Sequence, residues 1–466
     1  MSFLVYNRNE GVLREKAATL YLFLDAVGVG PFVPDRGYKM KGVRLGSVTP
    51  AVVALILAMG GLAHAFHSGG VAECGGCHSV HSPKAGGSFL LIGSDVGSTC
   101  LNCHEHAGDT GPSTYHISTA QGDMPVGIAP KQRTPGGDFG WLKKNYNFTV
   151  TGASIHEDGS THGHNIVAID FGYVPDPVNA TAPGGTFPSS QLTCNSCHDQ
   201  HGQFRRLNDG TVVTTGAPII DSGSYATGAT PGYSDPPAVG SALGAYRLLA
   251  GNGYRNAASG TIGFTGVPAA KVPNIYNQTE AVNQVRVAYG VKISGGQVAW
   301  GNWCATCHPA MHSNGNLVHP VDQTLGTTIA TNYKKYLRTG DLTGDGINGF
   351  TSLVPFAENT GDYAILASHA RSDNSFLTGP GDTDQVMCLS CHRAHASGWT
   401  EAMRWNMDST FMVYNSLYPG TDTTPTVPEF ARGRLAVETQ AAYYDRPVTT
   451  FASFQRVYCN KCHVKD

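Results

Sequence analysis

The sequence is dominated by one short motif, Cys-x-x-Cys-His, which occurs six times and includes all 12 cysteines. With 19 histidines in 466 residues, the chance that all six cysteine pairs are followed by histidine at random is on the order of one in 10⁸–10⁹. The cysteine pairs are Cys74 and Cys77, Cys100 and Cys103, Cys194 and Cys197, Cys304 and Cys307, Cys388 and Cys391, and Cys459 and Cys462. The histidines that complete the motifs are His78, His104, His198, His308, His392 and His463.

This spacing is the attachment signature of a c-type haem. The two thiols add to the two vinyl groups on one edge of a porphyrin, and the next residue then lies under the ring, where its imidazole binds iron as the proximal ligand. A zinc site would need paired Cys-x-x-Cys units and no fixed histidine. A disulfide framework would give no reason for the histidines. We therefore expect six covalently attached haems.

The composition favours a loop-rich chain. Gly 58 and Pro 26 together make up about 18% of the residues, against a usual ~12%, and only 14% of the residues are charged. These proportions argue against long amphipathic helices. The formal net charge of -3 argues against a nucleic-acid binder, which normally carries a basic patch.

The region before the first motif has the pattern of a secretory signal peptide. Met40 opens a segment with Lys41 and Arg44, followed by a short apolar run over 51–62 and an Ala-x-Ala site at 63–65. The run is shorter than the ~20 residues that span a membrane, so we expect cleavage and no transmembrane segment in the mature chain. We interpret 1–39 as an over-extended N-terminus, 40–65 as the signal peptide and 66–466 as a single hexahaem unit. Export fits haem attachment outside the cytoplasmic membrane.

Six haems in 66–466 leave about 67 residues for each haem, which is too few for a conventional core around each one. We expect a multihaem cytochrome c fold that is mostly irregular, with short α-helices, very little strand and a core formed by a stacked chain of haems. The sequence predicts short helices at His392–Met403 and Thr331–Leu337, a weak strand at Gly210–Thr215, and loops at Asp221–Gly240 and Thr421–Pro428.

Each iron has a second axial position, and the mature chain holds twelve further histidines, twice the number needed. Methionine ligands are also present in the sequence and would raise the potential, but the surplus of histidine favours bis-histidine iron. If helices follow the motifs, the histidines three residues after a proximal ligand project from the same helix face and reach a neighbouring haem. These are His81, His201 and His395. Candidates in loop-like contexts are His164, His319 and His369, with His116 as a further candidate. The others are interpreted mostly as ordinary solvated histidines, with His67 and His312 in reserve; they are His67, His106, His156, His162 and His312.

Several segments beyond the haem motifs resemble the OmcS-type hexahaem outer-surface cytochromes of metal-reducing bacteria, which polymerise into extracellular nanowires. The resemblance extends in patches over 66–466 and implies bis-histidine haems in a continuous stacked chain, with subunits joined head to tail. It also implies that the histidine three residues after the first proximal ligand, here His81, binds a haem of the adjacent subunit. The Ile155–Gly163 segment departs from the pattern, so His156 and His162 are not assigned as ligands. The resembling segments are Phe66–Glu73, Cys100–Ala120, Thr134–Trp141, Gly163–Ala168, Thr181–Thr186, Cys388–Gly398 and Cys459–Asp466.

The favoured function is therefore an electron carrier, not an enzyme, that acts at the cell outer surface as a head-to-tail homopolymer. Expected partners are outer-membrane or periplasmic donor cytochromes and extracellular acceptors such as metal oxides, electrodes or other cells. A multihaem reductase would need an open iron, and no Cys-x-x-Cys-Lys motif occurs. A monomeric periplasmic shuttle remains a third hypothesis. The Asp341–Asn348 stretch resembles the start of a calcium loop, but Ser352 stands where the loop needs Glu, so we expect a surface turn.

Overall fold

A computed structural model describes most of the chain from the first motif onward. The described residues are 74–79, 81–84, 90–105, 116–198, 249–250, 254, 263–266, 268–273, 275–291, 298–313 and 319–464, with the backbone of 205–206 and 212–213. All of them belong to one compact unit, Ala63–Asp466. The expected leader, His67, His106, His201 and the loop at Asp221–Gly240 lie outside the described residues.

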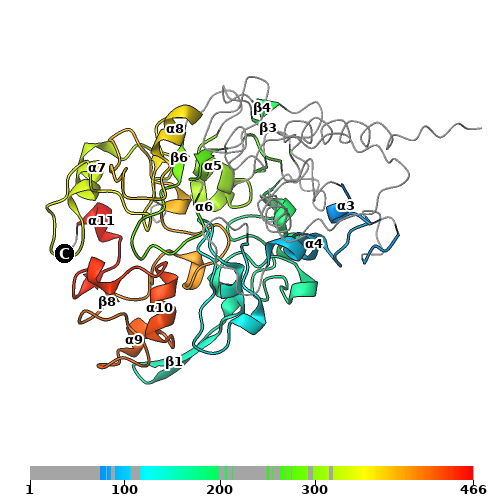
Figure 1. Cartoon of the computed structure of the whole chain (residues 1–466), viewed down its shortest axis with the longest axis horizontal. Helices are drawn as coiled ribbons and strands as arrows, with labels where there is room; N and C mark the ends of the chain where they lie inside the picture. Colours follow the sequence, from blue (N-terminus) through cyan, green and yellow to red (C-terminus); the bar gives the residue numbers. More distant parts are fainter. Residues whose placement is uncertain are drawn as a thin grey trace, which may run out of the picture. The chain divides into compact units, whose positions relative to one another are not determined.

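The helices are short (Figure 1). The α-helices are α3 (Cys74–Cys77), α4 (Val96–His104), α5 (Trp300–Ala305), α6 (Pro309–Ser313), α7 (Gly326–Lys335), α8 (Tyr363–His369), α9 (Pro428–Ala431), α10 (Ala436–Ala442) and α11 (Asn460–His463). Single turns of 3₁₀-helix are η1 (Gln121–Asp123), η2 (Phe139–Lys143), η3 (Gly159–His162), η4 (Ile169–Phe171), η5 (Ser189–Gln191), η6 (Cys194–Ser196), η7 (Cys388–Ser390), η8 (Thr400–Ala402) and η9 (Val448–Thr450). Within the described residues, no helix combines the length and the apolar character that crossing a bilayer requires.

The strands form small ladders. Strands β1 (Tyr146–Val150) and β2 (Ala153–Glu157) make an antiparallel hairpin in which Phe148 pairs with Ile155. The other strands are β3 (Arg205–Arg206), β4 (Val212–Val213), β5 (Ala269–Lys271), β6 (Ala288–Gly290), β7 (Ala357–Glu358), β8 (Phe411–Val413) and β9 (Gln455–Arg456). They pair as β3–β4, β5–β6–β7 and β8–β9, and only β6–β7 is parallel. This architecture is the loop-rich fold with short helices and little strand that the sequence predicts.

The polypeptide also builds an apolar core of its own, which the sequence does not predict. The largest buried cluster is aromatic and includes Trp141, Trp399, Trp405, Tyr443 and Tyr458. A second cluster surrounds Trp300 and Met387, next to the fourth and fifth motifs. Aromatic side chains bury a large apolar area each, so a few of them stabilise long loops that have no regular hydrogen-bonding pattern.

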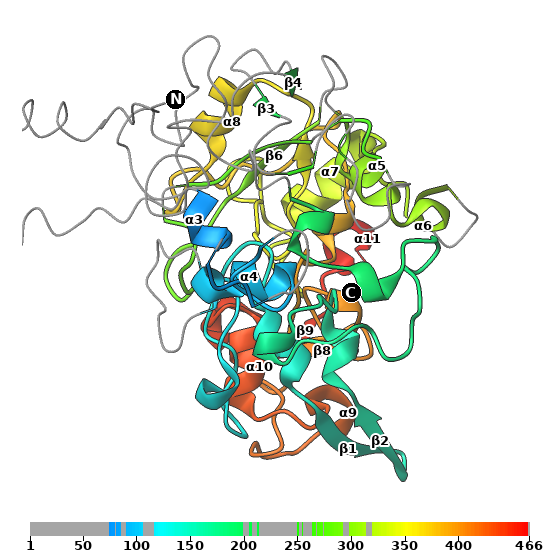
Figure 2. The same ribbon diagram turned by 90° about the vertical axis from the view of Figure 1, so that its right-hand side faces the viewer.

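Two contacts join segments that are far apart in the sequence. The hairpin β1–β2 lies against α9 (Figure 2). Helix α11, which carries the last motif, lies against α7, where the Lys461 ammonium donates hydrogen bonds to the carbonyls of Tyr333 and Tyr336 at 3.1 and 2.6 Å. The C-terminal motif is therefore held by residues that precede it by about 125 positions in the chain.

The local predictions succeed where local chemistry decides the backbone. Helix α7 covers most of Thr331–Leu337, β4 lies inside Gly210–Thr215, and Thr421–Pro428 is irregular until Pro428 begins α9. The helix predicted at His392–Met403 is wrong. His392 and Met403 form an isolated antiparallel bridge, and Glu401 between them has a φ of 58°, because this segment pairs with other parts of the chain instead of with itself.

Candidate functional site: six haem-attachment turns and the histidines around them

In the second to the sixth of the motifs that the sequence predicts to bind haem, the backbone turns so that the two cysteines and the histidine share one side. The His N–H donates to the carbonyl of the first Cys, four residues earlier, in the third to sixth motifs: His198 to Cys194 at 3.0 Å, His308 to Cys304 at 3.1 Å, His392 to Cys388 at 3.0 Å and His463 to Cys459 at 3.1 Å. The second motif lies at the end of α4, whose first turn is capped by the Asp95 carboxylate, an acceptor of the Ser98 N–H at 2.7 Å. Residues i, i+3 and i+4 of such a turn lie on one face, which is the placement that two thioether bonds and one axial imidazole need.

The cysteines are not joined to one another. No disulfide joins any of the eleven cysteines whose side chains are described, and most of these cysteines are half-buried. A disulfide framework is therefore absent from this part of the chain, and the thiols are available for attachment to porphyrin.

Consecutive motifs lie next to each other from the second to the sixth. Contact with the Cys194 side chain, together with burial, raises the pKa of the Cys100 thiol well above its usual value. Contact with Cys388 and burial do the same to the pKa of Cys304. These two contacts bring together the second and third motifs and the fourth and fifth.

The cysteines of the third and fourth motifs, and those of the fifth and sixth motifs, are also close enough to influence one another's pKa. Burial and the nearby Cys307 raise the pKa of Cys197 to about 12. Burial, Cys459 and Cys462 raise the pKa of Cys391 to about 12. The attachment points therefore follow one another in space in the same order as in the sequence.

Two histidine pairs have the separation expected for imidazoles on opposite faces of one iron. A metal–imidazole bond is about 2 Å long and the ring centre lies about 1 Å beyond the nitrogen, so such rings have centres about 6 Å apart. The rings of His164 and His308 have centres 6.0 Å apart. Those of His319 and His463 are 6.2 Å apart. The donor set and its spacing fit a bis-histidine haem at the fourth and sixth motifs.

Hydrogen bonds at Nδ1 fix which ring nitrogen could face iron. Nδ1 lies 2.7 Å from the Ala394 carbonyl in His164, 2.9 Å from the Pro183 carbonyl in His308 and 2.7 Å from the Glu401 carbonyl in His392. A carbonyl only accepts, so Nδ1 carries the proton in these rings and Nε2 keeps its lone pair. Metal-binding histidines are oriented in this way by their outer hydrogen bond.

His369, another predicted ligand, also has its Nδ1 next to an acceptor, but this acceptor is a carboxylate and not a carbonyl. It is the last residue of α8, not a loop residue as its sequence context predicts, and its ring stacks on Phe376 with centres 4.4 Å apart. Its Nδ1 lies 2.5 Å from Glu358 Oε2, and Glu358 also pairs with Arg286 at 3.0 Å. Glu358 is a supporting residue that the sequence does not reveal, because β7 and α8 come together only in the fold.

His395 is held by backbone pairing rather than by a helix. Its N–H donates to the Gly136 carbonyl at 2.8 Å and its carbonyl accepts from the His164 N–H at 2.9 Å. The ring stacks on Phe139 with centres 4.7 Å apart. Burial first, and then the nearby His198, lower the pKa of His395 to about 3, so the ring is neutral and suited to bind metal.

Glycine makes this close pairing possible. Ala396 bridges to both Gly137 and Gly163. A Cβ on Gly137, whose φ is 94°, would lie 1.8 Å from the Ala396 carbonyl oxygen, and one on Gly163 would lie 2.3 Å from the His395 oxygen. The three segments therefore form a small ladder that holds His164 and His395 side by side.

The remaining predicted histidines are placed differently. His116 is buried, and the next residue, Ile117, donates its N–H to the carbonyl of His104 in the second motif at 2.9 Å. His81 is exposed and follows its motif in a bend, not in a helix. His392 forms no paired-ring contact like those of His308 and His463 within the part of the chain that is described.

Two histidines have environments that do not suit iron. The ring of His162 is fully buried, with Nδ1 2.9 Å from the Trp141 carbonyl and Nε2 2.9 Å from Glu157 Oε1, so both nitrogens face acceptors. In His312, Nε2 lies 3.1 Å from a carboxylate oxygen of Asp322 and is engaged by it.

The Asp341–Asn348 stretch forms tight turns in which Asp345 Oδ1 accepts the N–H groups of Ile347 and Asn348 at 2.8 and 2.9 Å.

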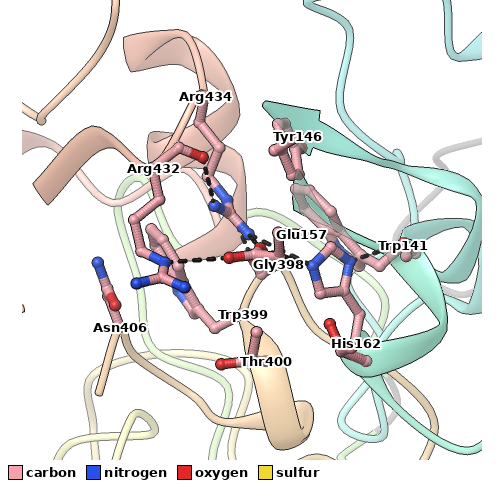
Figure 3. A network of polar contacts seen from close by, with 12 residues as sticks. Trp141, Tyr146, Glu157, His162, Gly398, Trp399, Thr400, Asn406, Arg432 and Arg434 are labelled. Carbon is pink, nitrogen blue, oxygen red and sulfur yellow. Dashed lines mark hydrogen bonds and ion pairs between the residues drawn. The ribbon is translucent and has the colours of Figure 1, made fainter. Parts of the chain in front are cut away.

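His162 belongs to a buried polar network that joins the hairpin to the C-terminal region (Figure 3). The Glu157 carboxylate accepts hydrogen bonds from Arg434 and, at 3.0 Å, from Arg432 Nε. The Arg434 guanidinium carbon lies 4.1 Å from the centre of the Tyr146 ring and 4.5 Å from the centre of the Trp399 ring. Burial raises the pKa of Glu157, but the hydrogen bond to His162 and the charge of Arg434 outweigh burial and hold the pKa well below its usual value. This network anchors the segment that leads to His164.

Comparisons with known proteins agree with these observations. No family model matches the chain. The curated C-type cytochrome OmcS of Geobacter sulfurreducens is 48% identical over 450 residues, which cover 91% of this chain and 100% of that protein. A cryo-EM structure of OmcS nanowires and one of an Outer Membrane Cytochrome S filament, both from Geobacter sulfurreducens, match with a TM-score of 0.76 at 47% and 48% identity, each covering 86% of this chain and 100% of the other. The chain therefore belongs to the OmcS family of c-type cytochromes, which carry covalently bound haem.

Proposed function

We propose that this chain is an extracellular electron-transfer protein that holds six c-type haems in a continuous row and assembles head to tail into filaments. The observation that carries the proposal is the succession of attachment turns, which are neighbours from the second motif to the sixth. Each bound haem supplies a one-electron iron couple, whose potential the protein tunes through ligands, burial and hydrogen bonds. The relatives that were solved as nanowires and filaments support the assembly.

The chain's residues have distinct roles in this proposal. The twelve motif cysteines attach the haems, and the motif histidines bind iron on one side. His164 binds opposite His308, and His319 binds opposite His463, on the strength of ring separations of 6.0 and 6.2 Å. The first three haems draw on the remaining candidates, and the neighbouring His198 favours His395 for the third. These remaining candidates are His116, His201, His369 and His395.

The fifth haem takes its second ligand from another copy. His392 presents an exposed ring whose Nδ1 is held by the Glu401 carbonyl, which leaves Nε2 oriented for metal. His81 is exposed near the other end of the unit's sequence. Among the described residues of one copy, no histidine faces the ring of His392. The exposed His81 of the next copy would supply this ligand, so the site would be complete only in a polymer.

The carrier function follows from full ligation. Iron with two imidazoles has no open position for a substrate, so the protein acts as a conduit and not as a reductase. It is exported through the 40–65 signal, receives electrons from outer-membrane or periplasmic cytochromes and delivers them to extracellular acceptors such as metal oxides.

Two experiments test the proposal. A pyridine haemochrome assay with intact mass should find six haems in each chain, and five or fewer would contradict the attachment scheme. His81→Ala should abolish or shorten filaments while each copy keeps six haems. His156→Ala is the matched control, because His156 is also an exposed histidine but bonds to Asn147 Oδ1 at 2.8 Å on the hairpin. Filaments of normal length from His81→Ala would remove the interface role.

A further inference from the structure

One predicted iron ligand differs from the others in the group that holds its outer nitrogen. In His164, His308 and His392, Nδ1 lies next to a neutral backbone carbonyl. In His369, Nδ1 lies 2.5 Å from Oε2 of Glu358. A carboxylate only accepts hydrogen bonds, so Nδ1 of His369 carries the proton and Nε2 keeps its lone pair for iron.

The fold fixes this contact from both sides. His369 ends α8, and its ring stacks on Phe376 with an angle of 13° between the ring planes. Glu358 ends β7, where its carbonyl accepts the Val291 N–H at 2.7 Å and its side chain is buried. The carboxylate and the imidazole are therefore held by packed elements, and their contact does not depend on a free surface rotamer.

Arg286 holds the other oxygen of the same carboxylate. Its Nη2 donates to Glu358 Oε1 at 3.0 Å, and its Nη1 donates to the Thr378 carbonyl at 2.7 Å. The guanidinium is buried and lies 4.7 Å from the centre of the Phe376 ring. Because arginine keeps its charge in proteins, Arg286 favours the ionised form of Glu358 and leaves Oε2 for the histidine.

The charge of this acceptor matters for the iron. A carboxylate on the outer nitrogen raises the basicity of a metal-bound imidazole, and hydrogen bonds to a charged group are about twice as strong as those between neutral groups. A more strongly donating ligand favours oxidised iron and so lowers the reduction potential, which is one of the levers by which a protein tunes a haem.

We propose that Glu358, oriented by Arg286, is a positioning residue that lowers the potential of the haem bound by His369, relative to the potential that a carbonyl partner would give. The inference rests on the proposed function, since it requires His369 to bind iron. One haem of the row is thereby set apart by its second ligand's partner, and electrons that hop along the row meet a step at this site.

The test is a spectroelectrochemical titration of the intact holoprotein carrying Glu358→Gln. Glutamine keeps an oxygen that accepts the Nδ1 proton but removes the negative charge. Changes to the outer partner of a metal-bound histidine typically alter metal affinity by about 10–100-fold. We expect one haem of six to be reduced about tenfold more readily, an upward shift of about 59 mV for one electron.

Asp384→Asn is the matched control. Asp384 is a half-buried carboxylate that interacts electrostatically with Glu358, but its two oxygens accept the N–H groups of Asn359 and Gly381 at 2.8 and 2.7 Å. Its replacement removes a charge from the same neighbourhood and leaves the imidazole's hydrogen bond intact. Potentials in Glu358→Gln equal to those in Asp384→Asn would overturn the inference.

Low-temperature EPR on the same samples separates this inference from the proposed function. Six low-spin irons in wild type and in Glu358→Gln, together with unchanged potentials, would remove the inference and leave the conduit standing. A high-spin iron in wild type would contradict the conduit itself. If Glu358→Gln does not assemble, a cryo-EM map of the wild-type filament decides. We expect His369 Nε2 at an iron and Nδ1 at Glu358, and a His369 that binds no iron would overturn the inference.

Discussion

Replacing Glu157 by glutamine should loosen the β1–β2 hairpin and the segment that leads to His164. Glu157 is buried and accepts hydrogen bonds from Arg434, Arg432 and His162. Glutamine keeps the shape but removes the negative charge, which leaves the fully buried Arg434 guanidinium without its counter-charge. Breaking a buried pair on one side costs about 3–5 kcal/mol.

Native-state hydrogen exchange, read by mass spectrometry on the intact holoprotein, measures this loss locally. A cost of about 3 kcal/mol corresponds to about 10²-fold faster exchange for peptides covering 146–164 and 428–435. The control is Asp158→Asn, which removes the same charge one residue later, where the half-exposed carboxylate caps Ser160 at 2.8 Å. Equal exchange in the two variants would refute the reasoning.

The pH dependence follows from the depressed pKa of Glu157. A carboxyl whose folded pKa lies below the unfolded value of 4.5 stabilises the fold fully above that value and loses this contribution as the pH falls through the folded pKa. The difference between wild type and Glu157→Gln should therefore be complete at pH 7 and shrink only in acid below pH 4.5. A difference that grows in acid would contradict the sign of this linkage.

Three further changes test the ligand scheme. His164→Ala should convert one haem in six to a high-spin or water-ligated form in resonance Raman spectra, since its ring faces His308 at 6.0 Å; an all-low-spin spectrum would exclude it as a ligand. His319→Met should raise the potential of one haem, because thioether ligation favours reduced iron; an unchanged titration would contradict the pair with His463. Gly137→Ala should destabilise the ladder around Ala396 by more than about 1–3 kcal/mol, as its Cβ would lie 1.8 Å from a carbonyl oxygen, and normal exchange protection at 394–397 would argue against the ladder.

The sequence predicts what depends on neighbouring residues. Two thiols and an imidazole at fixed spacing define an attachment turn wherever they occur, and all six motifs adopt helical turns or helix ends in the structure. The irregular fold follows from abundant glycine and scarce charge. The segment resemblance also identifies the family before any contact is known.

The sequence does not reveal contacts between distant segments. Local propensity predicts a helix after His392, but the backbone around His395 pairs with Gly136 and His164 instead. Glu157 and Arg434 are 277 residues apart, so no short pattern joins them. Arg393 and Arg404 resemble ordinary charged surface residues in the sequence, although the fold buries both side chains.

The central claim is that two histidine imidazoles bind the iron of every haem. For the fifth haem, one of these two imidazoles comes from the adjacent subunit. Low-temperature EPR with spin quantitation on the oxidised, intact filament tests it most directly. We expect six low-spin irons in each chain. After His81→Ala, five should remain low-spin and one, the haem at His392, should become high-spin. A reproducible high-spin iron in the wild-type filament would contradict the account.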